Sequence, residues 1–146
     1  MADHRHMARI LISESHDEVR RLLERMVTRL GHEPIVVTVT VPQQLRDADV
    51  LVVEPATPVG AVHAQAMCMV DPSLPIICAS ITSPPPELAE LGVVFAASLV
   101  KPFTLEQLGA TIEEALLAGG VQRDSRLRQD LRGGTVPHNS SAHQGA

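Results

Sequence analysis

Aromatic side chains are almost absent from this chain, whose 146 residues include two Phe and no Tyr or Trp. A core must therefore be built from Val, Leu, Ile, Ala and Met. The net charge of −5 argues against nucleic acid as a partner, because phosphate binding needs a basic face. No run of eighteen apolar residues and no apolar leader segment is present, so we expect a cytoplasmic protein without membrane contact.

Cysteine is equally scarce. Cys68 and Cys78 are the two in the chain, and each lies in an apolar run. We expect buried, reduced thiols rather than a disulfide. The length fits one domain, which we place at residues 8–118, with a flexible leader at 1–7 and a tail without fixed structure at 119–146.

Short apolar runs alternate with segments of helical spacing between Ala8 and about Ala118. The runs predict strands at residues 8–13, 34–41, 50–53, 75–79 and 95–100. Helical spacing predicts helices over 19–30, 59–70 and from Thr104 to Gly119-Gly120, and a short helix follows the prolines near 84–86. Only residues 43–48 remain for a second helix, which must be short. Five such units imply a parallel sheet with helices on both faces.

Polar and charged residues follow four of the predicted strands. They are Glu14 with Ser15, Glu54, Ser80 and Lys101. Since the carboxyl ends of parallel strands meet at one edge of a sheet, we expect these side chains to share a pocket.

Ser15, His16 and His63 can each be interpreted without a role in the pocket. Ser15 and Glu18 have the S-x-x-E spacing of a capping box, which favours Ser15 as a helix cap over Ser15 as a ligand. His16 and His63 are expected at the surface. A Glu54–Lys101 ion pair that only holds two loops together is a further alternative.

The segments that carry these residues resemble the receiver domain of bacterial two-component response regulators. The matching segments are ILISESHDEVRRLL, VLVVEPATP, LPIICAS and LVKPF, in that order over roughly 110 residues. The resemblance implies a flavodoxin-like, doubly wound (βα)₅ fold of the α/β class. It also implies the strand order 2-1-3-4-5, here with a shortened second helix.

In that family an aspartate accepts a phosphoryl group from a histidine kinase, with Mg²⁺ held by an acidic pair and the aspartate. The match places Glu54 at the phosphoacceptor position and Glu14 with Ser15 at the acidic pair. Ser80 and Lys101 take the phosphate-binding and switch positions. The position of the switch aromatic, three residues before the lysine, holds Ser98.

Three of these residues depart from the family pattern: Ser15, Glu54 and Ser98. A neutral hydroxyl at position 15 leaves Glu14 and Glu54 as the candidate metal ligands, so any Mg²⁺ site would be weak. The longer Glu54 moves its oxygens by about one C–C bond, and a displacement of ~1 Å can lower a rate ~100-fold. Glu54 could instead pair with Lys101, which would give either a constitutively switched domain or an unswitchable scaffold.

The pattern predicts a stand-alone, atypical receiver domain that is not an enzyme and has no catalytic residue. It would act through contacts with a signalling protein, either a histidine kinase or another regulator. It could also contact a second copy through the face made by the short helix after the prolines, the strand at 95–100 and the last helix. One alternative is a phosphorylatable single-domain regulator that uses Glu54 with weak Mg²⁺ assistance. Another is a flavodoxin-like small-ligand binder, which lacks the expected phosphate loop and aromatic residues.

Overall fold

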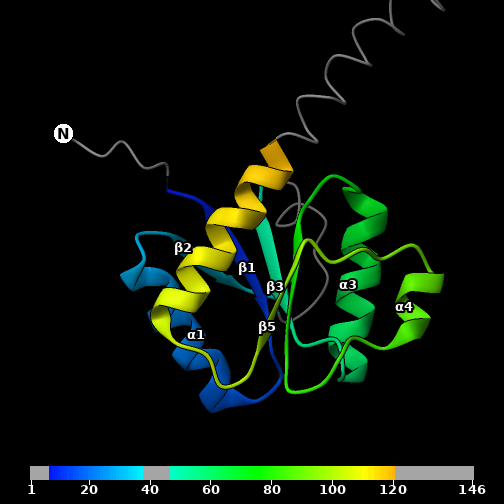
Figure 1. Ribbon diagram of the computed structural model, residues 1–146, viewed down its shortest axis with the longest axis horizontal. Coiled ribbons are helices and arrows are strands. Elements are labelled where there is room, and N and C mark those ends of the chain that lie inside the picture. The colour runs from blue at the N-terminus through cyan, green and yellow to red at the C-terminus, as the bar shows by residue number, and fades with distance from the viewer. Residues whose placement is uncertain (1–6, 38–46, 121–146) are drawn as a thin grey trace, which may run out of the picture.

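A computed structural model describes residues 7–37 and 47–120 of the chain. Five parallel strands form one sheet in the order β2-β1-β3-β4-β5, so the predicted order is confirmed (Figure 1). The strands are β1 (Arg9–Ser13), β2 (Glu33–Val36), β3 (Val50–Val53), β4 (Ile76–Ser80) and β5 (Ala97–Val100). The helices are α1 (Asp17–Arg29), α3 (Pro58–Val70), α4 (Pro86–Glu90) and a C-terminal helix over residues 105–120.

Two expectations fall largely on residues that are not described. The second strand was expected to reach residue 41, whereas β2 ends at Val36 and residues 38–46 lie outside the description. The short second helix expected at 43–48 also lies outside the description, apart from its last two residues.

No helix of the described part of the chain is long and apolar enough to cross a membrane.

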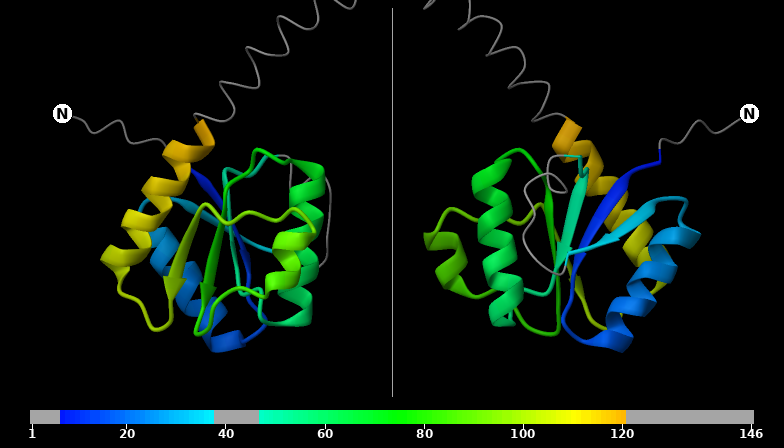
Figure 2. Two further views of the ribbon diagram at one scale, coloured as in Figure 1. Left: turned by 45° about the vertical axis from the view of Figure 1, so that its right-hand side comes forward. Right: turned by 180° about the vertical axis from the view of Figure 1, so that it is seen from behind.

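Helices cover both faces of the sheet. α1 and the C-terminal helix pack on one face, and α3 and α4 on the other (Figure 2). Successive strand residues alternate between the two layers, as side chains of a strand must. Ile10 and Ile12 pack with Leu23 and Val27 of α1, whereas Leu11 belongs to the cluster on the other face.

The central strands are buried along their whole length. All residues of β3 and β4 are buried, which explains why VLVV and IICA are continuous apolar runs rather than alternating ones. β5 is an edge strand, and its burial alternates along the chain. Branched aliphatic side chains therefore fill the core between the sheet and its two helical layers by close packing, with almost no aromatic rings.

The start of α1 differs from the prediction. The N-cap residue is His16, which makes no side-chain cap, while Ser15 lies one residue earlier and is exposed. The expected capping box between Ser15 and Glu18 was therefore wrong, because the helix begins one residue later than its spacing requires. A reciprocal box forms instead at the C-terminal helix, where Thr104 and Gln107 exchange bonds of 2.8 and 3.1 Å.

Glycines near the ends of two helices have different roles. Gly31 has φ 88°, and its N–H and that of His32 bond back to Thr28 and Val27, which ends α1 as the sequence predicts. Gly119 and Gly120 were expected to end the last helix, but both are helical. A Cβ on Gly119 would lie 2.8 Å from Cγ of Pro75, so the glycine allows the helix to approach the start of β4.

Candidate functional site

The predicted pocket residues meet where the parallel strands end. Glu14 follows β1, Glu54 follows β3, Ser80 closes β4 and Lys101 follows β5. Backbone bonds extend the sheet by one residue at this edge. Glu54 N donates to Ser13 O at 3.1 Å, and Lys101 N donates to Ser80 O at 3.1 Å.

The ammonium group of Lys101 lies between two carboxylates. Its Nζ is 2.6 Å from Oε1 of Glu14 and 2.8 Å from Oε1 of Glu54. The side chains of Glu14, Glu54 and Lys101 are 4%, 9% and 16% exposed, so all three charges are largely removed from water. Lys101 is also the only lysine of the chain. The three groups together carry one net negative charge.

Each carboxylate is fixed through its second oxygen. Oε2 of Glu14 accepts the N–H of His16 at 3.1 Å, and Oε2 of Glu54 accepts the N–H of Ala56 at 3.2 Å. Both bonds reach two residues along the chain, where the loop after the strand turns into a helix. These backbone N–H groups therefore help to keep the Oε1 atoms directed at Lys101.

Protonation equilibria agree with this geometry. Burial by itself raises the pKa of Glu54, but hydrogen bonds from Lys101, the Ser80 hydroxyl and the Ala56 N–H hold that pKa below its usual value. Burial by itself lowers the pKa of Lys101, whereas its bonds to Glu14 and Glu54 outweigh burial and raise it. The ammonium and the Glu54 carboxylate are both charged at neutral pH.

The other expected site residues take no part in this ion cluster, apart from Ser80. Its hydroxyl bonds to Glu54 and also accepts the N–H of Thr82 at 3.3 Å. Ser15 is exposed at the start of α1. Ser98 pairs with Cys78 across the β4–β5 ladder and faces a hollow that Phe103, Gln107 and Thr111 help to line.

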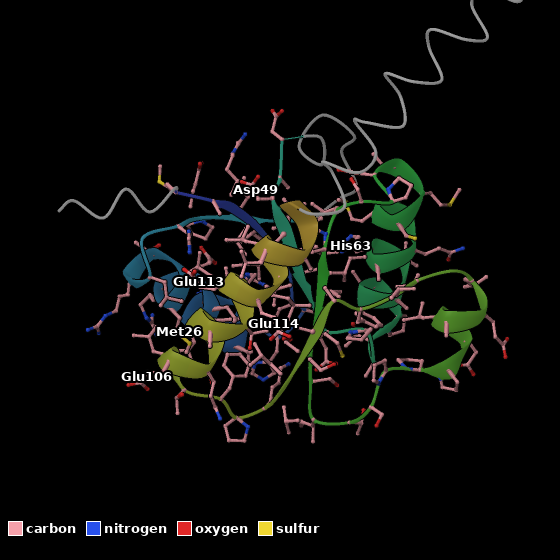
Figure 3. All side chains as sticks on the ribbon, turned by 45° about the horizontal axis from the view of Figure 1, so that its top comes forward. Met26, Asp49, His63, Glu106, Glu113 and Glu114 are labelled. Atoms are coloured by element: carbon pink, nitrogen blue, oxygen red, sulfur yellow. The ribbon has the colours of Figure 1, made fainter. Side chains whose placement is uncertain are left out.

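His63 was expected at the surface, and this prediction was wrong. It is buried on the face of α3 that meets the sheet, with Nδ1 2.6 Å from Oγ of Ser13 (Figure 3). Burial lowers the pKa of His63, so the ring is neutral. The bond ties α3 to the last residue of β1, directly before Glu14. Sequence periodicity missed this contact because α3 is apolar on every side and its inner face could not be identified.

Gly60 holds the loop that carries Glu54. Thr57 Oγ1 donates to the Glu54 carbonyl at 3.0 Å and accepts the Gly60 N–H at 3.0 Å. A Cβ on Gly60 would lie 1.8 Å from that same carbonyl oxygen. No other residue fits at position 60 without moving Glu54. No pattern in the sequence indicates this close approach.

The residues present do not suit a divalent metal. Mg²⁺ prefers six oxygen ligands in near-octahedral geometry. Within residues 7–37 and 47–120, no group of three or more His, Cys, Asp or Glu side chains could hold a metal ion. Glu14 and Glu54 are the carboxylates in reach, and the ammonium of Lys101 already binds both. The ammonium group of Lys101 thus lies between the carboxylates of Glu14 and Glu54.

Comparisons with known proteins agree with the architecture. No protein-family model and no curated protein matches the chain. Solved structures do: chemotaxis protein CheY4 of Vibrio cholerae has a TM-score of 0.64 at 23% identity, over 76% of this chain and 100% of that one. The receiver domain of a sensor histidine kinase from Pseudomonas aeruginosa, solved with magnesium in its active site cleft, gives 0.59 at 20%, over 76% and 98%.

A larger protein matches through part of its length. NtrX from Brucella abortus, solved with ADP, has a TM-score of 0.68 at 18% identity, and the match covers 86% of this chain but 30% of NtrX. Together with the strand order, these likenesses show that the chain has the flavodoxin-like fold of CheY-like receiver domains.

Replacing the lysine tests the ion cluster directly. In Lys101→Met two buried carboxylates face each other without a cation, and we expect a loss of about 3 kcal/mol in unfolding free energy at pH 7. The native Glu54, with its lowered pKa, stabilises the fold above its ordinary pKa of 4.5 and loses this contribution as pH falls. In the variant burial raises the pKa instead, so stability should rise as pH falls from 7 toward 4.5.

Urea titrations at several pH values measure both effects. Arg20→Met is the matched control, because Arg20 pairs with the exposed Asp17 at 2.8 Å and such pairs contribute less than about 1 kcal/mol. A Lys101→Met protein with native stability and native pH dependence would contradict the assigned cluster.

The same variant should gain a metal site. Without the ammonium, Glu14 and Glu54 present two converging carboxylates, and Mn²⁺ at about ten times its dissociation constant would stabilise the protein by about 1.4 kcal/mol. Thermal unfolding with and without Mn²⁺ measures the gain, which should be absent from the native protein and from Lys101→Met combined with Glu14→Gln. Equal stabilisation of the native protein would show that Lys101 does not occupy the cation position.

Gly60→Ala tests the support of the Glu54 loop. The added methyl group overlaps the Glu54 carbonyl, and we expect a loss of about 2 kcal/mol, as for other overpacked sites. Gly120→Ala is the control, since a Cβ there meets nothing within 4 Å. Denaturation midpoints of the two variants give the comparison, and an unchanged midpoint for Gly60→Ala would contradict the close approach.

Proposed function

We propose that the chain is an atypical receiver domain of a signalling pathway, which acts by protein–protein contact and without conventional aspartyl phosphorylation. One observation carries the proposal: the ammonium of Lys101 is bound by the carboxylates of both Glu14 and Glu54. The lysine is thereby held inside the protein in the position from which a receiver's lysine would meet a phosphoryl group.

Electrostatics disfavour phosphoryl transfer to this site. Transfer to a carboxylate requires cations that neutralise the phosphoryl oxygens. The cluster already has one negative charge in excess, and its single ammonium is engaged by Glu14 and Glu54. An anionic phosphoryl donor would approach two carboxylates, with no third acid at Ser15 to hold a metal.

An apolar groove beside the site supports contact with a protein partner. The groove has a volume of about 340 Å³, large enough for one bulky side chain. Lys101 is the one charged residue of its lining, which otherwise comes from α1 and the loops after β4 and β5: Val19, Leu22, Leu23, Met26, Ile81, Pro102 and Phe103. A partner in this groove would contact the ion cluster through Lys101. A histidine kinase or another regulator of the pathway would be such a partner.

Treatment with acetyl phosphate and Mg²⁺, followed by intact mass measurement, tests the proposal. Phosphorylation would require a Glu54 oxygen to attack phosphorus while acetate leaves. We expect no stable phosphoryl adduct on the native chain. Any acetyl group on the single lysine is recognised by its different mass.

A rebuilt variant provides the positive control. Ser15→Asp with Glu54→Asp restores the acidic pair and the shorter acceptor, and we expect it to accept a phosphoryl group at least tenfold more readily than the native chain. A phosphoryl adduct on the native protein that disappears in Glu54→Gln would overturn the proposal. That result would support a phosphorylated single-domain regulator.

A further inference from the structure

The helix α3 has no charged residue, and its exposed side is mostly apolar, with the half-buried Gln65 as its polar member. Val59, Val62 and Met69 are 51%, 59% and 76% exposed, and Ala66 between them is half-buried. These four residues follow one another at spacings of three and four, which places them in one stripe along the helix. The opposite side of α3 packs on the sheet through Gly60, His63, Ala64 and Met67.

The other described helices do not share this property. The outer surface of α1 carries charges such as Asp17 and Arg20, α4 carries Glu87 and Glu90, and acidic residues line the C-terminal helix. A helix that covers a sheet ordinarily presents polar residues to water, and one that is apolar all round is covered on its second side as well. The stripe on α3 is therefore suited to contact with another protein surface.

We infer that this stripe is the interface of a symmetric homodimer. The spacing of Val59, Val62, Ala66 and Met69 is that of the a and d positions of a coiled-coil heptad, in which two helices of the same kind interlock. A two-fold axis through the middle of the stripe places the stripe of one copy against the same stripe of the other.

Charge favours a second copy at this face over the faces formed by α4 and the C-terminal helix, both of which are acidic. Each copy carries a net charge of −5, so two copies repel when their acidic helices approach. α3 places no like charges opposite each other. Exposed apolar residues also lie in the segment beside α3, where Cys68 Sγ donates to the Gly92 carbonyl at 3.3 Å and Leu91 and Val94 are open to solvent. Figure 2 shows α4, which leads into this segment, alongside α3.

The size of the contact predicts its strength. The 13 residues of α3 span about 20 Å, so the interface is smaller than the ~800 Å² per partner of a standard stable complex. The dimer is therefore reversible and depends on protein concentration. The stripe is uncharged, while the negative net charges of the two copies repel each other. Added salt screens this repulsion and should therefore lower the dissociation constant of the dimer.

Sedimentation velocity of the full chain over a concentration series tests the inference. We expect a monomer–dimer equilibrium whose dissociation constant rises at least about tenfold in Val62→Glu, which places a charge in the seam. Leu117→Glu is the matched control, because Leu117 is 72% exposed on the C-terminal helix, and it should leave the equilibrium unchanged. Circular dichroism confirms that each variant is folded.

Two further experiments test whether the α3 stripe, rather than another face, forms the dimer interface. A mixture of Val62→Glu and Val62→Lys should restore association, since opposite charges then meet across the seam. Val100→Glu, at a 68% exposed position of β5, should dimerise normally. The inference is overturned by a chain that stays monomeric at high concentration. It is equally overturned if Val100→Glu dissociates the dimer while Val62→Glu does not, since the face that contains β5 then mediates the contact.

Discussion

The contact of one ammonium with two buried carboxylates links the ends of three strands. Lys101 is 87 residues from Glu14 and 47 residues from Glu54 along the chain, yet its Nζ lies within 2.8 Å of an oxygen of each. Transferring any one of these charges out of water alone would cost several kcal/mol. Each group is stable in the pocket because the other two are present, so the loops after β1, β3 and β5 are constrained as one unit.

The positions of these loops follow from the strands beneath them. A parallel sheet buried on both faces requires continuous apolar strands, and VLVV and IICA have that character in the sequence. The first polar residue after each run therefore marks the edge of the sheet. Glu54 and Lys101 could be placed together from sequence for this reason, and the strand order followed from the resemblance to receiver domains.

Other features of the site could not be predicted, and each has a physical reason. His63 was placed at the surface because apolar residues occur all around a helix without charged residues, and they give no sign of which side meets the sheet. Ser15 was expected to cap α1, but the Glu14 carboxylate binds the N–H of His16 at the turn into the helix. The need for Gly60 depends on the approach of one carbonyl oxygen, which no local pattern records.

Two of the residues that differ from the receiver pattern that the sequence resembles, Ser15 and Glu54, are consistent with the same ion cluster. A third acid at position 15 would raise the excess negative charge around Lys101 from one to two, with no second cation to balance it. An aspartate at position 54 would be shorter by one C–C bond of about 1.5 Å. The longer Glu54 spans from the Ala56 N–H at one oxygen to the Lys101 ammonium at the other. The neutral Ser15 and the lengthened Glu54 thus both suit a pocket whose cation is part of the chain.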